Sequence, residues 1–319
     1  MKIFQTKIED NHIQEISKVL KIGQLGFGPN VELFERKYSS YSNKKFNIAT
    51  NSASASAFMI FSYLKDKYGT CDVYTTSLGF TSPAWAAKHH GHNLIFVDVN
   101  NDLQFSSEHY KQVRKKNKNQ NVVMPVLYGG VSTIDDFNLY GDEVVVVDSA
   151  HCATPTIKSD FVFFSFHPYK PICTSDGGMI STDDYEASEY FQKYRNFGRM
   201  KNGVTYDIVQ NGFKFYMNNL NASIGLTQLE NYNQRVEDRK KIFSSLNKKY
   251  DLLQHDEKSS YYFATTLISN ADEVIKKYNI SRHYPMLHKT SYFKNKQILP
   301  VLENLHEKIL NIPLTGEWT

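Results

Sequence analysis

Five short segments of this chain are largely apolar along their whole length, and stretches with helical spacing separate some of them. The apolar segments are 72–76 (DVYTT), 94–99 (LIFVDV), 122–127 (VVMPVL), 143–147 (EVVVV) and 161–166 (FVFFSF). Strands that are apolar on both faces are typical of a parallel sheet that helices cover on each side. Residues 44–190 are therefore predicted to form an open, mostly parallel α/β sheet.

Apolar residues recur at intervals of three and four in several other segments, as on one face of a helix. These segments are 12–22, 31–41, 55–68 and, after the sheet, a long stretch over 221–250 that leads into a smaller α+β portion. A chain of 319 residues exceeds the usual size of one compact core. We therefore expect a large domain over residues 1–240 and a small one over residues 241–319.

The charge and hydropathy patterns indicate neither a nucleic-acid partner nor a membrane. The chain has 37 basic and 33 acidic residues, and its net charge of +4 is mild. A lysine-rich run at 115–121 (KKNKNQN) has no interleaved aromatic residues, so we interpret it as a solvated loop. No apolar run reaches about 18 residues and no signal peptide is evident, so neither membrane spanning nor secretion is expected.

Cysteine and histidine give no indication of a metal site. Cys71, Cys152 and Cys173 are too few and too scattered for a disulfide framework or a zinc knuckle. Such sparse cysteines favour a reducing compartment, so a cytoplasmic protein is expected. The histidines in HHGH at 89–92 are better explained by a surface turn between a helix and a strand than by a bound metal.

A lysine and an aspartate follow the ends of two apolar runs. Lys170 closes FVFFSFHPYK, and Asp148 ends EVVVVD 22 residues earlier. Open α/β sheets bind ligands at the carboxyl ends of their strands. Pyridoxal phosphate (PLP) requires such a pair, because an amine forms a Schiff base with its aldehyde and a carboxylate keeps its pyridine nitrogen protonated. Taken alone, the pair is more simply a surface lysine and a strand-end cap.

The turn TNSASASAF at 50–58 joins a short strand, FNIA, to a helix. Its small residues let backbone N–H groups approach an anion at the helix N-terminus, and Ser52, Ser54 and Ser56 add hydroxyl donors. A cofactor phosphate fits such a turn. Serine-rich helix starts are also common as simple N-caps, so the turn supports the PLP hypothesis without establishing it.

Ten segments, in order along almost the whole chain, carry a family resemblance. They are GPNVELFERKYSSY, TNSASAS, LGFTSPAWAAKHHGHNLIFVDVN, VVVDSAHC, FSFHPYK, SDGGMISTDD, RNFGR, MNNLNASIGLTQLE, RHYPMLH and LPVLENLHEKILNIPL. They resemble the motifs of the nucleotide-sugar aminotransferases of the DegT/StrS group; FSFHPYK, for example, is similar to SFxPTK, and VVVDSAHC to DxAH. The resemblance implies an α/β fold-type I PLP-transferase with a large, mostly parallel sheet and a small C-terminal α+β domain.

The resemblance also implies roles for individual residues. Lys170 would form the Schiff base and, once released, move the substrate proton, while Asp148 would pair with the pyridine nitrogen. His151 would lie near the phenolic oxygen of the cofactor, and Phe80 would stack on its ring. The residues implied to hold the phosphate are Ser54, Ala55 and Ser165. The segment that borders the sugar-binding cleft contains His283, Tyr284 and His288.

The chain departs from the family pattern at four places. Residues 53–54 (Ala-Ser for Gly-Thr) and 175–176 (Ser-Asp for Gly-Glu) are modest changes. Lys214 replaces an asparagine that in the family reaches across a dimer interface to the cofactor phosphate, and Tyr216 replaces an arginine. We expect Lys214 to bind that phosphate or a substrate phosphate, although a solvated loop lysine is the alternative. The chain stops at IPLTGEWT, where family members continue with a helix, so a reduced small domain is expected.

The function implied by the resemblance is amino transfer by a homodimer whose active site lies at the interface. L-Glutamate would donate its amino group to PLP, and the product would aminate a nucleotide-linked keto-sugar for cell-surface polysaccharide or a related glycan. Lys170 favours amino transfer over dehydration, because a dehydratase branch of the family has histidine there. Two alternatives stay open: a keto substrate without a nucleotide, and a PLP-binding regulator with little turnover.

Overall fold

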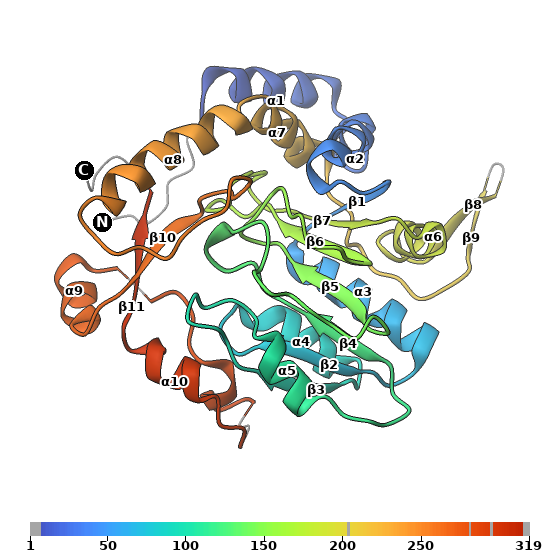
Figure 1. The fold of residues 1–319 in the computed structure, drawn as a ribbon. Helices are drawn as coiled ribbons and strands as arrows, with labels where there is room; N and C mark the ends of the chain where they lie inside the picture. The colour runs from blue at the N-terminus through green and yellow to red at the C-terminus, as the bar shows by residue number, and fades with distance from the viewer. Residues whose placement is uncertain (1–7, 203–204, 281, 294–295, 315–319) are drawn as a thin grey trace.

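A seven-stranded sheet runs through the centre of the protein (Figure 1). The computed structural model describes residues 8–202, 205–280, 282–293 and 296–314. In spatial order, the strands are β1 (Phe46–Thr50), β7 (Gly178–Thr182), β6 (Phe161–Ser165), β5 (Val144–Asp148), β4 (Asn121–Met124), β2 (Asp72–Thr76) and β3 (Asn93–Val97). All neighbouring pairs are parallel except the two that include β7. The predicted sheet is thus confirmed.

Helices cover both faces of this sheet, which explains why its strands are apolar on both sides. One face packs against α2 (Pro29–Ser42), α5 (Ser107–Val113) and α7 (Asn219–Glu230), and the other against α3 (Ala53–Tyr68), α4 (Thr81–His89) and α6 (Tyr185–Tyr194). In β5, Val147 belongs to the first core and Val146 to the second. Consecutive strand residues point to opposite faces, so each face receives its own apolar row.

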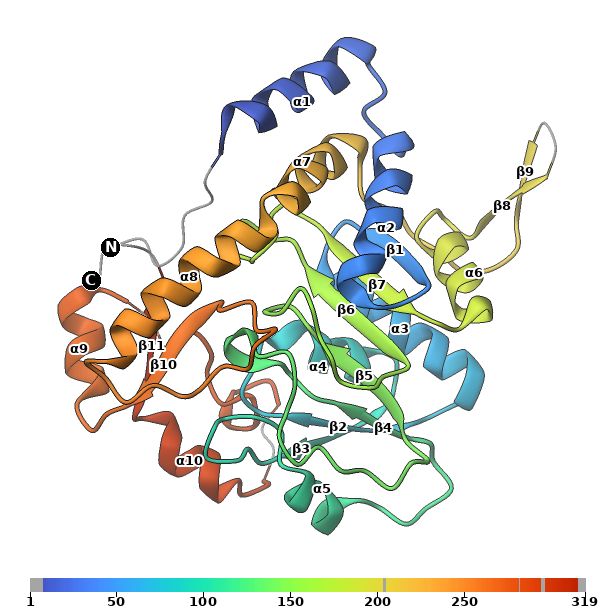
Figure 2. The ribbon, with the colours of Figure 1, turned by 45° about the horizontal axis from the view of Figure 1, so that its top comes forward.

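The N-terminal helix α1 (Asp10–Ile22) lies outside these layers and packs on α7 (Figure 2). The buried residues of α1 are His12 and Val19. His12 Nε2 lies 2.7 Å from the Gln228 side-chain nitrogen on α7. This contact fixes the helix to the body, while Ile13 and Leu20 remain exposed.

A small C-terminal unit adjoins the carboxyl end of β3. It consists of the antiparallel pair β10 (Phe263–Leu267) and β11 (Ile309–Pro313) with α9 (Ala271–Tyr278) and α10 (Pro300–His306). The carboxylate of Asp98 accepts hydrogen bonds from the N–H groups of Val301 and Leu302, both at 2.9 Å, and so caps α10. The predicted division near residue 240 remains a prediction. The chain end at 315–319 lies outside the described residues.

The prediction of one long helix over 221–250 is wrong. The structure has two helices, α7 and α8 (Tyr232–Asn247), separated at Asn231. The Asn231 amide donates to Glu9 at 3.2 Å, and the Arg235 guanidinium donates to the Gln228 carbonyl at 2.6 Å. The Arg235 side chain thus satisfies a backbone carbonyl at the end of α7, and the Asn231 side chain joins this turn to the residue before α1.

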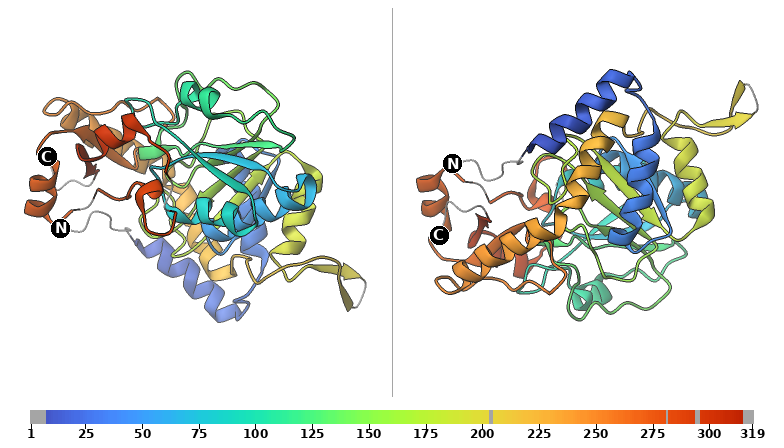
Figure 3. Two further views of the ribbon diagram at one scale, coloured as in Figure 1. Left: turned by 90° about the horizontal axis from the view of Figure 1, so that it is seen from below. Right: turned by 90° about the horizontal axis from the view of Figure 1, so that it is seen from above.

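A two-stranded hairpin stands away from the body, as both views in Figure 3 show. It pairs β8 (Arg199–Asn202) with β9 (Thr205–Ile208) and follows α6. Its exposed side chains include Tyr206 and Ile208. Within the described residues, none of the helices combines the length and apolar character needed to cross a bilayer.

Candidate active site

A cavity of about 610 Å³ opens at the carboxyl ends of β5 and β6. Its other walls come from the starts of α3 and α4, the segment 167–177, Tyr262 and residues 283–284. Because parallel strands present their carboxyl ends at one edge, the topology gathers these segments there. Eight of the predicted site residues line the cavity: Ser54, Phe80, Asp148, His151, Ser165, Lys170, His283 and Tyr284.

Asp148 is a buried carboxylate at the wall of this cavity, with 3% of its surface exposed. Its backbone is fixed by bonds to Pro125 and Leu127 at 2.9 and 3.0 Å. One carboxylate oxygen accepts the Ala150 N–H at 3.0 Å, and the other has no donor among the described residues. Burial raises the pKa of this carboxyl, while Ala150 and Lys170 lower it. The second oxygen is thus available to a ligand.

Lys170 lies in the turn after β6, and its backbone N–H donates to the His167 carbonyl at 2.9 Å. Its Nζ lies 4.6 Å from the centre of the Tyr262 ring. Burial lowers the pKa of this amine, and the charge of Asp148 opposes that change. A lowered pKa increases the neutral fraction of the amine, which is the form that attacks a carbonyl.

The first turn of α3 forms a wall rich in donors. Ser52 is its N-cap, and the Ser52 hydroxyl accepts the Ala55 N–H at 3.1 Å. The N–H groups of Ala53 and Ser54 have no acceptor in the described part of the chain, as is usual for the first residues of a helix. The Ser54 hydroxyl donates to Ser82 at 2.8 Å and ties α3 to α4.

Gly178 lets β7 approach this helix start. A Cβ at position 178 would lie 2.5 Å from the carbonyl carbon of Ser52 and 2.6 Å from the nitrogen of Ala53. Gly178 also pairs with Thr50 on one side and with Ser165 on the other. The glycine thus holds the start of α3 near the end of β6, where helix N–H groups and serine hydroxyls can bind an anion.

The His151 ring lies between two tyrosines. Its Nε2 is 2.7 Å from the Tyr284 hydroxyl, and its ring stacks on Tyr262 with centroids 4.4 Å apart. Burial lowers the pKa of His151, and Lys170 and His283 lower it further, so the ring is neutral at pH 7. Its Nδ1 is buried and has no hydrogen-bond partner among the described residues. A bound ligand is one way to satisfy such an atom.

Two predicted residues lie behind the cavity wall rather than on it. Ala55 is 5% exposed, and its N–H is already bonded to Ser52. His288 is buried, with Nδ1 2.7 Å from the Ser77 hydroxyl and Nε2 3.1 Å from Glu303. His288 therefore anchors the C-terminal segment to the end of β2, and a direct substrate contact remains only a prediction.

Lys214 lies beside a second cavity, of about 470 Å³, together with Asn51 and Tyr216. Its carbonyl accepts the Asn51 side-chain amide at 3.1 Å, and its Nζ is 5.7 Å from the Tyr216 ring. The side chain is exposed. Lys214 thus does not line the main cavity of its own chain, and its predicted role depends on a second subunit.

A family model described as the DegT/DnrJ/EryC1/StrS aminotransferase family matches residues 6–319. The chain belongs to this family. The predicted family is thus confirmed, and so are the enzyme class and its cofactor, PLP.

Proteins similar to this aminotransferase come from several bacteria. The spore coat polysaccharide biosynthesis protein SpsC of Bacillus subtilis is 30% identical over 74% of this chain and 65% of SpsC. A UDP-4-amino-4,6-dideoxy-N-acetyl-beta-L-altrosamine transaminase of Campylobacter jejuni is 26% identical over 92% of this chain and 77% of that protein. The PLP form of Spr1654 from Streptococcus pneumoniae has a TM-score of 0.88 at 23% identity, covering 100% of this chain and 94% of Spr1654.

The cavity of this aminotransferase suits PLP. It offers an amine on Lys170, a buried carboxylate oxygen on Asp148 and unpaired N–H groups at the start of α3. The unpartnered Nδ1 of His151 is a fourth group that a polar cofactor can satisfy. Phe80 lines the cavity and is 59% exposed, so its side chain is accessible for stacking.

Sequence reasoning missed several residues that line the cavity of this aminotransferase. They are Ser82, His167, Tyr169, Asp176 and Tyr262, besides apolar and backbone contributors. His167 and Tyr169 lie inside the FSFHPYK motif, which could have indicated them. Tyr262 lies in SSYYF, where no local pattern distinguishes it from core tyrosines.

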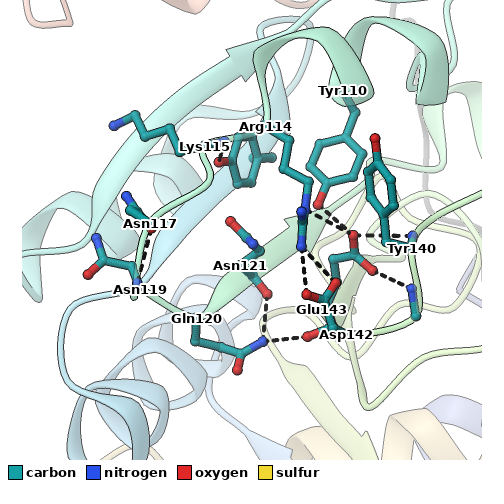
Figure 4. A network of polar contacts seen from close by, with 12 residues as sticks. Tyr110, Arg114, Lys115, Asn117, Asn119, Gln120, Asn121, Tyr140, Asp142 and Glu143 are labelled. Carbon is teal, nitrogen blue, oxygen red and sulfur yellow. Dashed lines mark hydrogen bonds and ion pairs between the residues drawn. The ribbon is translucent and has the colours of Figure 1, made fainter.

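The lysine-rich run 115–121 leads into the start of β4 (Figure 4). The Arg114 guanidinium donates to both carboxylate oxygens of Asp142, at 2.8 and 2.6 Å, and Gln120 donates to the Asp142 carbonyl. The lysines in this run are exposed. In the described residues, no cluster of three or more His, Cys, Asp or Glu side chains is placed to hold a metal ion.

Proposed function

We propose that this aminotransferase moves an amino group from L-glutamate to a keto-sugar carried on a nucleotide. The observation that carries the proposal is the shared cavity of Lys170 and Asp148 in a chain of this family. The substrate class is supported by the C. jejuni relative, whose name specifies a UDP-linked amino sugar. The amino donor is inferred from the family resemblance alone.

PLP, when bound, supplies an aldehyde that carries the amino group and a ring that withdraws electrons. The residues of this chain would hold and orient it. The start of α3 and the hydroxyls of Ser54 and Ser165 would bind the phosphate. Asp148 would keep a proton on the ring nitrogen, and Phe80 would cover one face of the ring.

Lys170 has two tasks in this proposal. It would hold the cofactor through the aldehyde carbon, for which the amine must be neutral, and burial favours the neutral form because it lowers the pKa of Lys170. When it is not joined to the cofactor, the same amine would move the substrate proton, as general base and then as general acid. The neutral ring of His151 lies close by, between Tyr262 and Tyr284.

The assembly we propose is a homodimer whose interface completes the active site. Exposed apolar side chains on the hairpin and the segment after it support this: Met200, Tyr206, Ile208, Val209 and Phe213. Lys214 follows Phe213 directly, so a partner seated there would bring its active site near Lys214.

We place the reaction in the cytoplasm, because Cys71, Cys152 and Cys173 are all buried thiols.

By analogy with SpsC, the product would enter a cell-surface polysaccharide, O-antigen or a related glycan. The test is to incubate the purified protein with L-glutamate and a panel of nucleotide-linked keto-sugars. We expect an amino-sugar product and 2-oxoglutarate in equal amounts for at least one member. The same keto-sugars without the nucleotide test whether that group is needed.

The variant Lys170→Ala serves as the negative control for this panel. Turnover only with free keto-sugars would replace the nucleotide-linked substrate with a free one. PLP binding without turnover of any keto-sugar would indicate a regulator instead of an enzyme.

A further inference from the structure

Tyr262 contacts two residues of the candidate active site at once. Its ring centre lies 4.6 Å from Nζ of Lys170, and its ring stacks on His151 at an interplanar angle of 29°. Tyr262 is 3% exposed and lines the main cavity. An ammonium group within about 6 Å of an aromatic ring centre is attracted to the electron-rich face. The contact therefore favours the charged form of Lys170 in this position.

The backbone around Tyr262 is fixed by the turn at Gly129–Gly130. The Tyr262 N–H donates to the Gly129 carbonyl at 3.0 Å, and the Ser260 N–H donates to the Gly130 carbonyl at 2.7 Å. A Cβ on Gly130 would lie 2.9 Å from the Tyr262 nitrogen. Tyr261, just before, has a φ of +47°, a conformation that non-glycine residues seldom adopt. The surrounding contacts thus hold the ring in one place.

Lys170 needs such support when it is not joined to the cofactor. Its Nζ has no hydrogen-bond acceptor among the described residues, and a lysine stem has many rotamers. We propose that Tyr262 is a positioning residue for Lys170, whose ring face holds the free ammonium form inside the cavity. The proposal rests on the proposed function, in which Lys170 acts both joined to the cofactor and free.

Other titratable groups also face Lys170 in the cavity, and they stay unchanged in the test below. Asp148 favours the charged amine, whereas burial opposes it. The remaining titratable groups in the cavity wall are His151, His167, Tyr169, Asp176, His283 and Tyr284.

The experiment measures the protonation of Lys170 in the full-length chain after removal of PLP. Acetic anhydride labels only neutral amines, so the labelling rate of the Lys170 peptide, followed by mass spectrometry across pH, gives its titration midpoint. We compare the unchanged protein with Tyr262→Phe, Tyr262→Leu and a series of Tyr262→Phe proteins whose new ring carries increasing numbers of fluorine atoms. Fluorine weakens the negative face of the ring but barely changes its shape. Lys88, whose Nζ lies 4.6 Å from the Tyr292 ring, is an internal control in the same samples.

We expect Tyr262→Phe to titrate like the unchanged protein, because the ring face remains. Tyr262→Leu should lower the midpoint by about one pH unit, and each added fluorine should lower it in steps. The Lys88 midpoint should not move. A Lys170 midpoint that is the same in the whole fluorinated series would overturn the proposal.

An equal drop in Tyr262→Phe and Tyr262→Leu would also overturn it, because the hydroxyl would then be responsible. If Tyr262→Leu does not fold, the fluorinated series alone decides. The labelling measurement needs no turnover, so a negative result for Tyr262 can be told apart from a failure of the proposed function. An unchanged midpoint in an active transaminase contradicts only the role of Tyr262.

Discussion

The hydroxyl of Tyr284 lies 2.7 Å from Nε2 of His151, and this contact joins the C-terminal segment to the loop after β5. It links parts of the chain that are 133 residues apart. Because burial lowers the pKa of His151, its ring is neutral and carries one proton, on Nδ1 or on Nε2, and the role of the Tyr284 hydroxyl as donor or acceptor follows from that choice. If Tyr284 donates to Nε2, the unpartnered Nδ1 carries a hydrogen that a cofactor oxygen can accept.

Tyr284→Phe should therefore weaken PLP binding by about fivefold to tenfold, the effect of losing one hydrogen bond of about 1 kcal/mol. Fluorescence titration of the PLP-free protein with PLP measures this. Tyr128→Phe is the matched control, because the Tyr128 hydroxyl bonds Asn311 at 2.8 Å and does not line the cavity. PLP affinity that falls equally in both variants would count against a specific role for Tyr284.

Asp148→Asn removes the charge that would keep the pyridine nitrogen protonated. The loss of such a charge-assisted contact costs about 3–5 kcal/mol, so the rate should fall by hundreds- to thousands-fold. PLP should still bind through its phosphate and Lys170. Single-turnover kinetics and the visible spectrum of the variant measure the two effects separately. A near-normal rate would show that a different group serves the ring nitrogen.

Gly178→Ala should disturb the anion site at the start of α3. The new Cβ would lie 2.5 Å from the Ser52 carbonyl carbon, and both atoms belong to ordered backbone. We expect a loss of unfolding free energy of at least about 2 kcal/mol together with weaker PLP binding. Thermal melts with and without PLP test this. An unchanged melting temperature would mean that the backbone relaxes freely around position 178.

Lys214→Ala tests whether this lysine serves a phosphate of the neighbouring subunit. Its exposed ammonium acts as a point charge, so its loss should weaken PLP or substrate binding more than it slows the chemical step. Added salt should produce a milder version of the same effect in the unchanged protein. If both the PLP affinity and the sugar KM stay the same, Lys214 is only a solvated loop residue.

The sheet could be predicted because its strands are apolar on both faces, a pattern that few other structures produce. The joint position of Asp148 and Lys170 followed from topology, since the carboxyl ends of parallel strands share one edge. The break at Asn231 could not be predicted, because asparagine is only a weak helix breaker and its partner Glu9 lies 222 residues away.

The place of Tyr262 in the cavity wall near Lys170 could not be predicted either. Tyr262 reaches the cavity only because its backbone pairs with Gly129, a contact across more than a hundred residues. His288 illustrates the reverse: it belongs to a recognisable motif, yet the structure places its ring between Ser77 and Glu303. A motif identifies a segment near the site but not which side chains face into it.

The proposed chemistry depends on covalent binding of PLP to Lys170. The direct measurement is borohydride reduction of the purified, PLP-loaded protein, followed by digestion and mass spectrometry. We predict a visible-range absorbance that borohydride abolishes, and a pyridoxyl group fixed to the peptide that contains Lys170. Lys170→Ala should show neither signal and no transamination while it keeps the native fold. A pyridoxyl group on another lysine, or normal turnover by Lys170→Ala, would contradict the assignment of Lys170.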